Sequence, residues 1–255
     1  MTLLQKVLSV CFVYLLFSPS VIANEKGGKY AAAINLENGT QIGFSYHLPS
    51  TYQNGQSYPA LIGPGNAKVE EEHGFFWRYK PSSHGWIIIE TPVMYELNEV
   101  QGAEAVSKIL DYMDTHYKIE GNKFHGIGWS ANSGTAFNRV IALSDRFHSI
   151  TGLPGHPRNI SERVIQQLNN VKVNFIVGEN DNYWLKKSKS AEHQLRKNGI
   201  VQLPASMTIS GKKGEPPTIA SFNQELGFSV KSPDWAATVP IAQRRTVNLA
   251  TLGIP

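Results

Sequence analysis

The chain has 255 residues and a formal net charge of +4, from 24 lysines and arginines against 20 aspartates and glutamates. The basic residues are spread along the sequence rather than clustered, which excludes the phosphate-tracking surface of a nucleic-acid-binding protein. The single cysteine, Cys11, excludes a disulfide framework and a thiolate metal site.

Residues 1–23 have the features of a secretory signal peptide. Lys6 provides a basic start, and the apolar run "VLSVCFVYLLF" that follows it is short for a membrane span. Val21 and Ala23 occupy the positions where a signal peptidase requires small residues. We expect cleavage after Ala23, which leaves 255 − 23 = 232 residues and, without Lys6, a net charge of 23 − 20 = +3. The prediction is a secreted or periplasmic protein without a stable membrane anchor after cleavage; an uncleaved N-terminal anchor is the alternative.

Strand-like and helix-like segments alternate after the signal peptide. Strands appear as apolar or alternating runs bounded by turn residues, and helices as apolar residues at helical spacing. The turn pair Asn38–Gly39 joins the first two strands. Expected strands span residues 30–48 (two strands), 58–65, 85–93, 123–130, 147–155, 171–181 and 205–210. Expected helices span residues 70–79, 103–117, 133–144, 160–170 and 185–199.

This alternation predicts an α/β fold, a three-layer sandwich in which helices cover both faces of a mostly parallel sheet. Neither an internal repeat nor a long linker divides residues 24–210, so we expect one core domain there. From residue 211 onward the periodicity is lost and prolines accumulate, which predicts an irregular C-terminal tail over residues 211–255.

The stretch "GWSAN" at residues 128–132 nearly matches the glycine-x-serine-x-glycine motif. A serine on a tight strand-to-helix turn needs small neighbours two positions away, because the strand and helix backbones converge there. Asn132 replaces the second glycine, and asparagine tolerates unusual backbone angles. On this motif, placed between an expected strand and an expected helix, the chain resembles the α/β-hydrolase superfamily, in particular small secreted esterases and polyester (polyhydroxybutyrate) depolymerases. The resemblance covers about residues 30–210 as an order of elements and implies that Ser130 is a nucleophile.

The resemblance also implies roles for residues in other loops. An oxyanion hole would pair the N–H of Ala131 with one from the loop of Gly65 and Asn66, although that loop is also explained as a strand-ending turn. The acid would stand at the carboxyl end of the next-to-last strand, where Asp181 is found with Glu179 as its rival. Asp181 is equally suited to cap the helix that follows.

The third member of the triad is missing from its usual place. In the superfamily the histidine follows the last strand, but no histidine occurs after His193. Loops after strands share the catalytic edge of a parallel sheet, and only His73 and His156 fall in such loops. We favour His156, although an ordinary loop position explains it as well. The remaining histidines belong to the opposite edge or to helices: His47, His84, His116, His125, His148 and His193.

A lysine base or an altered carboxyl end would also account for the missing histidine. Lys212 or Lys213 would replace it only if burial lowered the lysine pKa by several units, and the sequence around them does not indicate burial. Alternatively, a reading-frame error has replaced the original carboxyl end, because the periodicity stops where the histidine is expected. Resequencing the 3′ end of the gene decides whether the frame is altered.

The sequence therefore predicts a serine hydrolase that acts on carboxylic esters, with a small-molecule or a polymeric substrate. No long insertion precedes Asp181, so a large lid is not expected and an open site is. A relative without catalysis, which binds a ligand or partner, is the alternative that the missing histidine supports, and a serine peptidase is a third. The histidines lack ligand spacing and no glycine-rich phosphate loop is present, so we expect no metal and no other cofactor. Aromatic residues line a pocket or pack in the core: Phe75, Phe76, Trp77, Tyr183 and Trp184.

Overall fold

The structure is a computed structural model that describes residues 25–65, 85–94, 98–128, 130–178, 181–200 and 207–209. The strands are β1 (Gly28–Asn35), β2 (Gln41–Leu48), β3 (Ser57–Tyr58), β4 (Ala60–Pro64), β5 (Ile87–Thr91), β6 (Lys118–Ile119), β7 (Phe124–Gly128), β8 (Phe147–Gly152), β9 (Lys172–Gly178) and β10 (Met207–Ile209). The α-helices are α2 (Glu99–His116), α3 (Ser133–Ala142), α4 (Glu162–Leu168) and α5 (Asn182–Lys197). Short 3-10 turns connect them: η3 (Pro92–Met94), η4 (Glu120–Asn122), η5 (Ser130–Asn132) and η6 (Ser144–Arg146).

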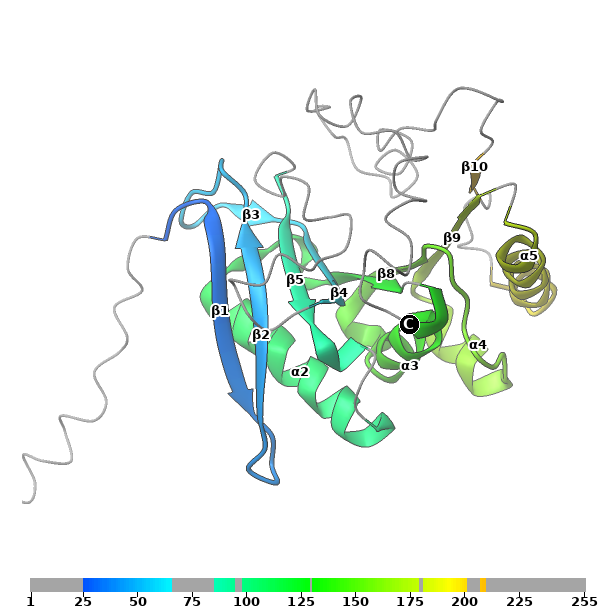
Figure 1. Cartoon of the computed structure of the whole chain (residues 1–255), viewed down its shortest axis with the longest axis horizontal. Coiled ribbons are helices and arrows are strands. Elements are labelled where there is room, and N and C mark those ends of the chain that lie inside the picture. The colour runs from blue at the N-terminus through cyan, green and yellow to red at the C-terminus, as the bar shows by residue number, and fades with distance from the viewer. Residues whose placement is uncertain are drawn as a thin grey trace, which may run out of the picture.

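The described strands build a mostly parallel sheet, as the sequence predicts (Figure 1). Their order is β1-β2-β5-β4-β7-β8-β9-β10, and β3 pairs with β6 in a separate small ribbon. β1 and β2 form an antiparallel hairpin around Gly39, whose φ of 83° is the kind of angle that a tight turn demands of glycine. β2 is antiparallel to β5, and the pairs from β5 to β10 are all parallel.

Every strand and helix predicted within the described residues is present, with small differences at the ends. α2 begins at Glu99, four residues before its predicted start, because the Asn98 side chain accepts a hydrogen bond from the Gln101 amide at 2.9 Å and caps the helix. α5 begins at Asn182 because Asp181 caps it in the same way. The helix predicted over residues 70–79, the signal peptide and the tail from residue 211 lie outside the described residues.

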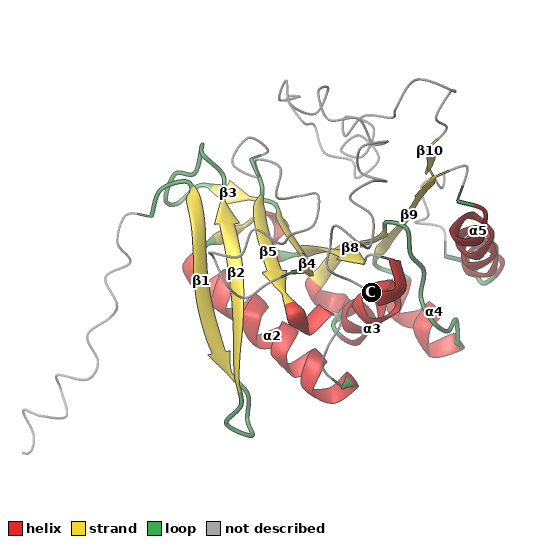
Figure 2. Cartoon of the chain, viewed as in Figure 1, coloured by secondary structure: helices red, strands yellow, loops and turns green. Residues whose placement is uncertain are grey.

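One face of the sheet is apolar and carries the core. Strand residues such as Phe44, Ile62, Ile89 and Phe175 join one buried cluster with side chains from α2, α3, α4 and α5. Figure 2 shows α2 running behind the hairpin of β1 and β2, and the contacts place α3 against β7 and α5 against β9. Burial of this continuous apolar surface is the main force that holds the layers together.

The other face of the sheet is also buried, and it carries polar side chains among apolar ones. Cross-strand register places His47 beside Ile88, Ile88 beside Leu61, and Leu61 beside His125. Hydrogen-bonded pairs lie along this face: His47 Nε2 with Glu90 Oε2 at 3.1 Å, His125 Nδ1 with Ser149 Oγ at 2.7 Å, and Asn174 Nδ2 with Thr151 Oγ1 at 3.2 Å. Buried polar groups need such partners, because an unsatisfied group costs about 1–3 kcal/mol.

Two features are absent from the described residues. None of their helices combines the length and the apolar character that a membrane crossing requires. Within the same residues, no three side chains of His, Cys, Asp or Glu gather closely enough to hold a metal ion.

Candidate active site

Ser130 lies on a strained bend just beyond the carboxyl end of β7. Its φ angle is 47°, in the left-handed region that non-glycine residues seldom adopt and that is concentrated at functional sites. β7 ends at Gly128 and α3 begins at Ser133, with η5 between them. The chain therefore turns from strand to helix within a few residues, with Ser130 at the turn. Trp129 lies outside the described residues.

The small residues of the motif are explained by close packing. A Cβ atom at Gly128 would lie 2.8 Å from the Cα atom of Ser133 and 3.1 Å from the Cβ atom of Ala136, so only glycine fits. Asn132, which replaces the motif's second glycine, has φ −83° and ψ −9°, which are ordinary helical values. The replacement therefore needs no tolerance of unusual backbone angles, contrary to the reason that the sequence suggested.

The bend stands at the point where the sheet order reverses. β4 and β7 are neighbours, but the chain continues from β4 to β5 on one side and from β7 to β8 on the other. Loops that leave the sheet in opposite directions open a crevice at the carboxyl ends of their strands, and α/β proteins build their sites there. Gly65, after β4, and Ser130, after β7, both lie at this edge, because the two strands are parallel neighbours.

The predicted oxyanion donors are the backbone N–H groups of Gly65, Asn66 and Ala131, and the structure gives a different finding for each. The N–H of Gly65 donates to the Thr91 carbonyl at 3.3 Å, so this donor is engaged between β4 and β5. Glycine is required at position 65 because a Cβ atom would lie 2.5 Å from that of Glu90. Ala131 directly follows Ser130 in η5, and its N–H remains a predicted donor. Asn66 lies outside the described residues.

The loop after β8 is bonded to the serine bend. The N–H of Ser130 donates to the Pro154 carbonyl at 2.8 Å, and the N–H of Leu153 donates to the Gly128 carbonyl at 2.9 Å. Farther along, Gly155 packs so closely on Ser133 that a Cβ atom would lie 2.2 Å from that of the serine. These contacts hold the loop that contains His156 against the start of α3.

His156 is the predicted base, and the structure brings it to the first turn of α3. Its backbone N–H donates to Ser133 Oγ at 3.4 Å. Its ring Nδ1 lies 2.8 Å from the Pro157 carbonyl. Because a carbonyl only accepts hydrogen bonds, Nδ1 is the donor in this contact, and in the neutral ring Nε2 is then the nitrogen with the lone pair. No hydrogen bond joins His156 to Ser130 in the described part of the chain.

Asp181, the predicted acid, is the N-cap of α5. Its Oδ1 accepts a hydrogen bond from the Trp184 amide at 3.2 Å, which is the capping role weighed against catalysis from the sequence. The Trp184 ring lies 5.7 Å from the His156 ring, centroid to centroid, so the start of α5 and the loop after β8 are neighbours. Asp181 itself makes no hydrogen bond to a histidine of the described ranges. Its rival, Glu179, lies outside them.

The other histidines of the described ranges do not approach the bend. His47 and His125 lie in one row across the sheet, and His125 is three residues before the end of β7 at Gly128, about 10 Å at the rise of a strand. His148 contacts His125, with ring centroids 5.2 Å apart. Two more are helical, His116 at the end of α2 and His193 in α5. His73, His84, Lys212 and Lys213 lie outside the described residues.

Comparisons with known proteins identify the fold. No protein-family model and no curated protein matches the chain. Among solved structures, a thermostable esterase matches with a TM-score of 0.53 at 15% identity, over 69% of this chain and 53% of the esterase. A dienelactone hydrolase-like promiscuous phosphotriesterase from metagenomic libraries matches with a TM-score of 0.52 at 13% identity, over 89% of this chain and 98% of the other.

A peptidase has the same architecture. Dipeptidyl peptidase 4 of Porphyromonas gingivalis matches with a TM-score of 0.57 at 12% identity, over 80% of this chain and 35% of that protein. The chain thus spans about half of the esterase and about a third of the peptidase. With the sheet order and the strained serine after a central strand, these likenesses show that the chain has the α/β-hydrolase fold.

The sequence did not point to Arg158, which the structure places at the same helix start. Its Nη2 donates to Thr135 Oγ1 at 2.9 Å, and its side chain covers Gly134. The available signal was an arginine two residues after His156 in a loop that follows a strand.

Of the predicted aromatic lining, Trp184 contacts His156, whereas Tyr183 is 64% exposed. Phe75, Phe76 and Trp77 lie outside the described residues.

Proposed function

We propose that this chain is a serine hydrolase that acts on carboxylic esters, with Ser130 as its nucleophile. The observation that carries the proposal is the left-handed φ of 47° at Ser130, at the carboxyl end of a central strand and at the reversal of the sheet order. A residue with a Cβ atom is held at such an angle only where the surrounding packing enforces it. The likeness to esterases and peptidases of the same fold supports the proposal. We propose further that the protein is secreted or periplasmic and that its substrate is a small or a polymeric ester.

In the proposed reaction, Ser130 Oγ attacks the ester carbonyl carbon and transfers its proton to Nε2 of His156. The imidazolium returns this proton to the departing alkoxide, which leaves an acyl group on Ser130. Water, deprotonated by the same nitrogen, then attacks the acyl carbonyl carbon, and the imidazolium returns this proton to Ser130 Oγ as the acid leaves. The N–H of Ala131 stabilises the oxyanion, and such a donor is worth about 3–4 kcal/mol in the transition state. The Pro157 carbonyl holds the tautomer of His156, a task that a carboxylate performs in the usual triad.

A fluorophosphonate probe tests whether Ser130 is activated. The wild-type protein is expected to be labelled, and Ser130→Ala is expected to abolish the label because the nucleophile is gone. Ser190→Ala is the matched control, because Ser190 lies exposed on α5, where its hydroxyl accepts a hydrogen bond from Gln194 Nε2 at 3.3 Å. Absence of labelling in the wild type, or labelling that survives Ser130→Ala, would refute the proposal.

Two other functions have an observation in their favour. The hydrogen bond from the Trp184 amide to Asp181 favours a relative without catalysis that binds a ligand, because it engages the predicted acid in helix capping. The match to a dipeptidyl peptidase favours a peptidase. A labelled protein that cleaves peptide anilides faster than aryl esters would support the peptidase, and a folded protein that is not labelled would support the binding protein.

A further inference from the structure

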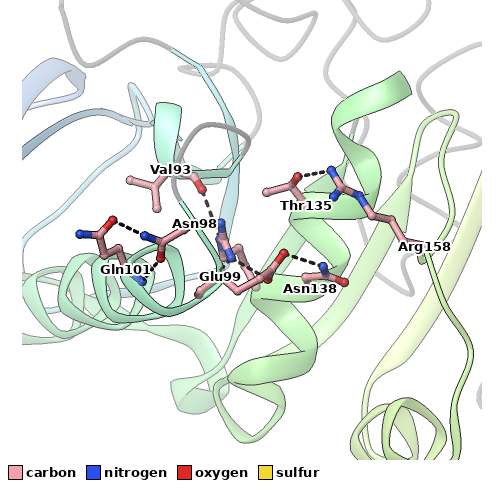
Figure 3. Close-up of polar contacts among 8 residues, drawn as sticks. Val93, Asn98, Glu99, Gln101, Thr135, Asn138 and Arg158 are labelled. Atoms are coloured by element: carbon pink, nitrogen blue, oxygen red, sulfur yellow. Dashed lines mark hydrogen bonds and ion pairs between the residues drawn. The ribbon is translucent and has the colours of Figure 1, made fainter.

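Arg158 is a cation held in a fixed position near the serine bend. The Pro154 carbonyl accepts a hydrogen bond from the N–H of Ser130 at 2.8 Å, which anchors the start of the loop. Four residues later, Arg158 reaches the first turn of α3, where its Nη2 donates to Thr135 Oγ1 at 2.9 Å (Figure 3). The loop is therefore bonded to the bend at one end and to α3 at the other.

Gly134 lets the Arg158 side chain lie flat on α3. A Cβ atom at Gly134 would lie 2.3 Å from Cγ and 2.6 Å from Nε of Arg158, so the arginine occupies that space. Arg158 therefore lies against the first turn of α3, at the residues Gly134 and Thr135. Gly134 is the second residue of α3 and follows Ser130 by four positions, which is about 6–8 Å along η5 and the start of the helix. A substituent a few bonds from a carbonyl held at Ser130 would span this distance.

Arg158, in the loop after β8, and Arg139, on α3, have different partners. Arg139 is buried and forms an ion pair with Glu99 at 3.0 Å. The other oxygen of that carboxylate accepts a hydrogen bond from Asn138 at 2.9 Å (Figure 3). Arg158 is exposed, and within the described ranges it has the Thr135 hydroxyl but no carboxylate. A guanidinium has five N–H donors, so most of those of Arg158 are available to a ligand.

The electrostatic setting of Arg158 favours an anion. The N-terminus of a helix carries a partial positive charge, so a cation is disfavoured there and an anion is stabilised. The charge of Arg158 also acts on Arg139, whose guanidinium pKa is lowered mainly by burial and additionally by Arg158. A carboxylate bound at Arg158 would relieve this repulsion and accept two parallel hydrogen bonds, the arrangement that suits arginine best.

We propose that Arg158 binds a carboxylate of the substrate, so that the preferred substrates are esters that carry a negative charge a few bonds from the carbonyl under attack. The inference rests on the proposed hydrolase function and specifies its substrate class. Arg158 thereby acts as a specificity residue: it contacts the distant end of the substrate and leaves the chemistry at Ser130 unchanged.

Two esters of equal chain length test this proposal. 4-Nitrophenyl hemiadipate carries a carboxylate about 6 Å from its ester carbonyl in the extended form, and 4-nitrophenyl hexanoate carries none. We expect wild type to prefer the hemiadipate in kcat/KM, and Arg158→Gln to reduce this preference about tenfold while the value for the hexanoate stays within about twofold. Arg158→Lys keeps the charge and is expected to retain part of the preference. Arg163→Gln is the control, because it removes an exposed arginine from α4.

The outcomes separate the two proposals. A wild-type preference that shrinks as salt rises from about 0.01 M to about 1 M supports an ionic contact, which a purely structural arginine would not produce. Hydrolysis of both esters with an equal loss in Arg158→Gln, or with no change in the preference, overturns the anion site and leaves the hydrolase function standing. If wild type hydrolyses neither ester and is not labelled at Ser130, the hydrolase function is wrong and the anion site falls with it.

Discussion

The residues around Ser130 are small because backbone and side chains converge on them. At Gly128 the obstacle is the backbone of Ser133, at Gly155 the side chain of Ser133, and at Gly134 the side chain of Arg158. None of these glycines has a positive φ, so space rather than backbone conformation explains each of them. The strained angle of the site belongs to Ser130 alone among these residues.

Gly128→Ala tests this packing. We expect it to lower the free energy of unfolding by about 1–3 kcal/mol, because the new methyl group would lie 2.8 Å from the Cα atom of Ser133, and backbone cannot move aside as a flexible side chain does. Labelling of Ser130 should fall as well, since the bend would shift. Urea unfolding measures the stability. Gly28→Ala is the control, because a Cβ atom there would have its nearest neighbour at 3.7 Å; equal losses in both variants would contradict the role of close packing.

His156→Gln tests the base. Glutamine keeps a polar side chain of similar size but does not take up a proton, so we expect kcat/KM for an aryl ester to fall about 100-fold to 10,000-fold, the contribution of a general base. The stability of the fold should change little. The control is His193→Gln on the exposed surface of α5. Activity unchanged in His156→Gln would assign the base to another residue.

Part of the site could be predicted from the sequence and part could not. The bend at Ser130 follows from local residues, since "GWSAN" lies between a strand pattern and a helix pattern. The contacts of Gly134 with Arg158 and of Gly65 with Glu90 join residues about 25 positions apart, and only the folded sheet brings them together. For Asp181 the sequence predicts either helix capping or a catalytic acid. The structure shows the capping role, and the catalytic role stays a prediction.

Among the elements, the sheet buries polar side chains on the face that is turned away from the main core. His125, in β7, is 5% exposed, and its Nδ1 forms a hydrogen bond of 2.7 Å with Ser149 Oγ. Burial, together with the smaller effect of the charges of His148 and Lys172, lowers the pKa of His125 to about 3. The sequence showed a histidine within a strand pattern but could not show that the strand buries it, because the periodicity of a strand does not say which face is covered.

The neutral state of His125 makes stability depend on pH. The unfolded chain binds a proton at this residue near pH 6.5, whereas the folded chain excludes it down to about pH 3. The unfolded state therefore binds more protons between these values, and stability is complete above pH 6.5 and falls by about 1.4 kcal/mol for each pH unit below it. We expect urea titrations of His125→Gln to show a shallower decline than wild type between pH 6.5 and about pH 4. An equal slope in the two proteins would contradict the assignment.

The helices are joined by a buried cation. Arg139 of α3 donates to the Glu99 carboxylate at 3.0 Å and to the Val93 carbonyl at 3.4 Å, and thus links α3 to the start of α2 and to η3. Gly102 of α2 faces the guanidinium so closely that a Cβ atom would lie 2.0 Å from its Cζ. The sequence predicted both helices from their apolar residues, but the ion pair between them depends on their crossing, which a linear pattern does not contain.

At the scale of the molecule, the alternation of strands and helices was sufficient to predict the α/β class and the mostly parallel sheet. The ribbon of β3 and β6 escaped prediction because two-residue strands have no periodicity to detect. The limits of the core domain, residues 24–210, stay a prediction. The predicted signal cleavage after Ala23 also stays a prediction. Its position matters for the fold because Glu25, two residues later, contacts the core.

Glu25 would be the second residue of the mature chain, and it is bonded to the core. Tyr117 donates a hydrogen bond to its carboxylate, and the Tyr46 hydroxyl lies 3.5 Å from the other oxygen. Burial raises the pKa of both tyrosine hydroxyls, so they remain protonated donors at neutral pH. Cleavage after Ala23 would keep this contact, whereas cleavage two or more residues later would remove it.

We therefore expect the intact mass and N-terminal sequence of the exported protein to correspond to a chain that begins at Asn24. Glu25→Ala should be cleaved at the same bond but should be less stable by about 1–2 kcal/mol in urea unfolding, because the two tyrosine hydroxyls lose their carboxylate acceptor and keep only the hydrogen bond of 2.8 Å between them. Lys26→Ala is the control, since its side chain is exposed. A mature chain that starts beyond Glu25 would contradict the cleavage site. Unchanged stability of Glu25→Ala would show instead that the tyrosine hydroxyls find other acceptors and that the N-terminal contact does not hold the hairpin of β1 and β2 to α2.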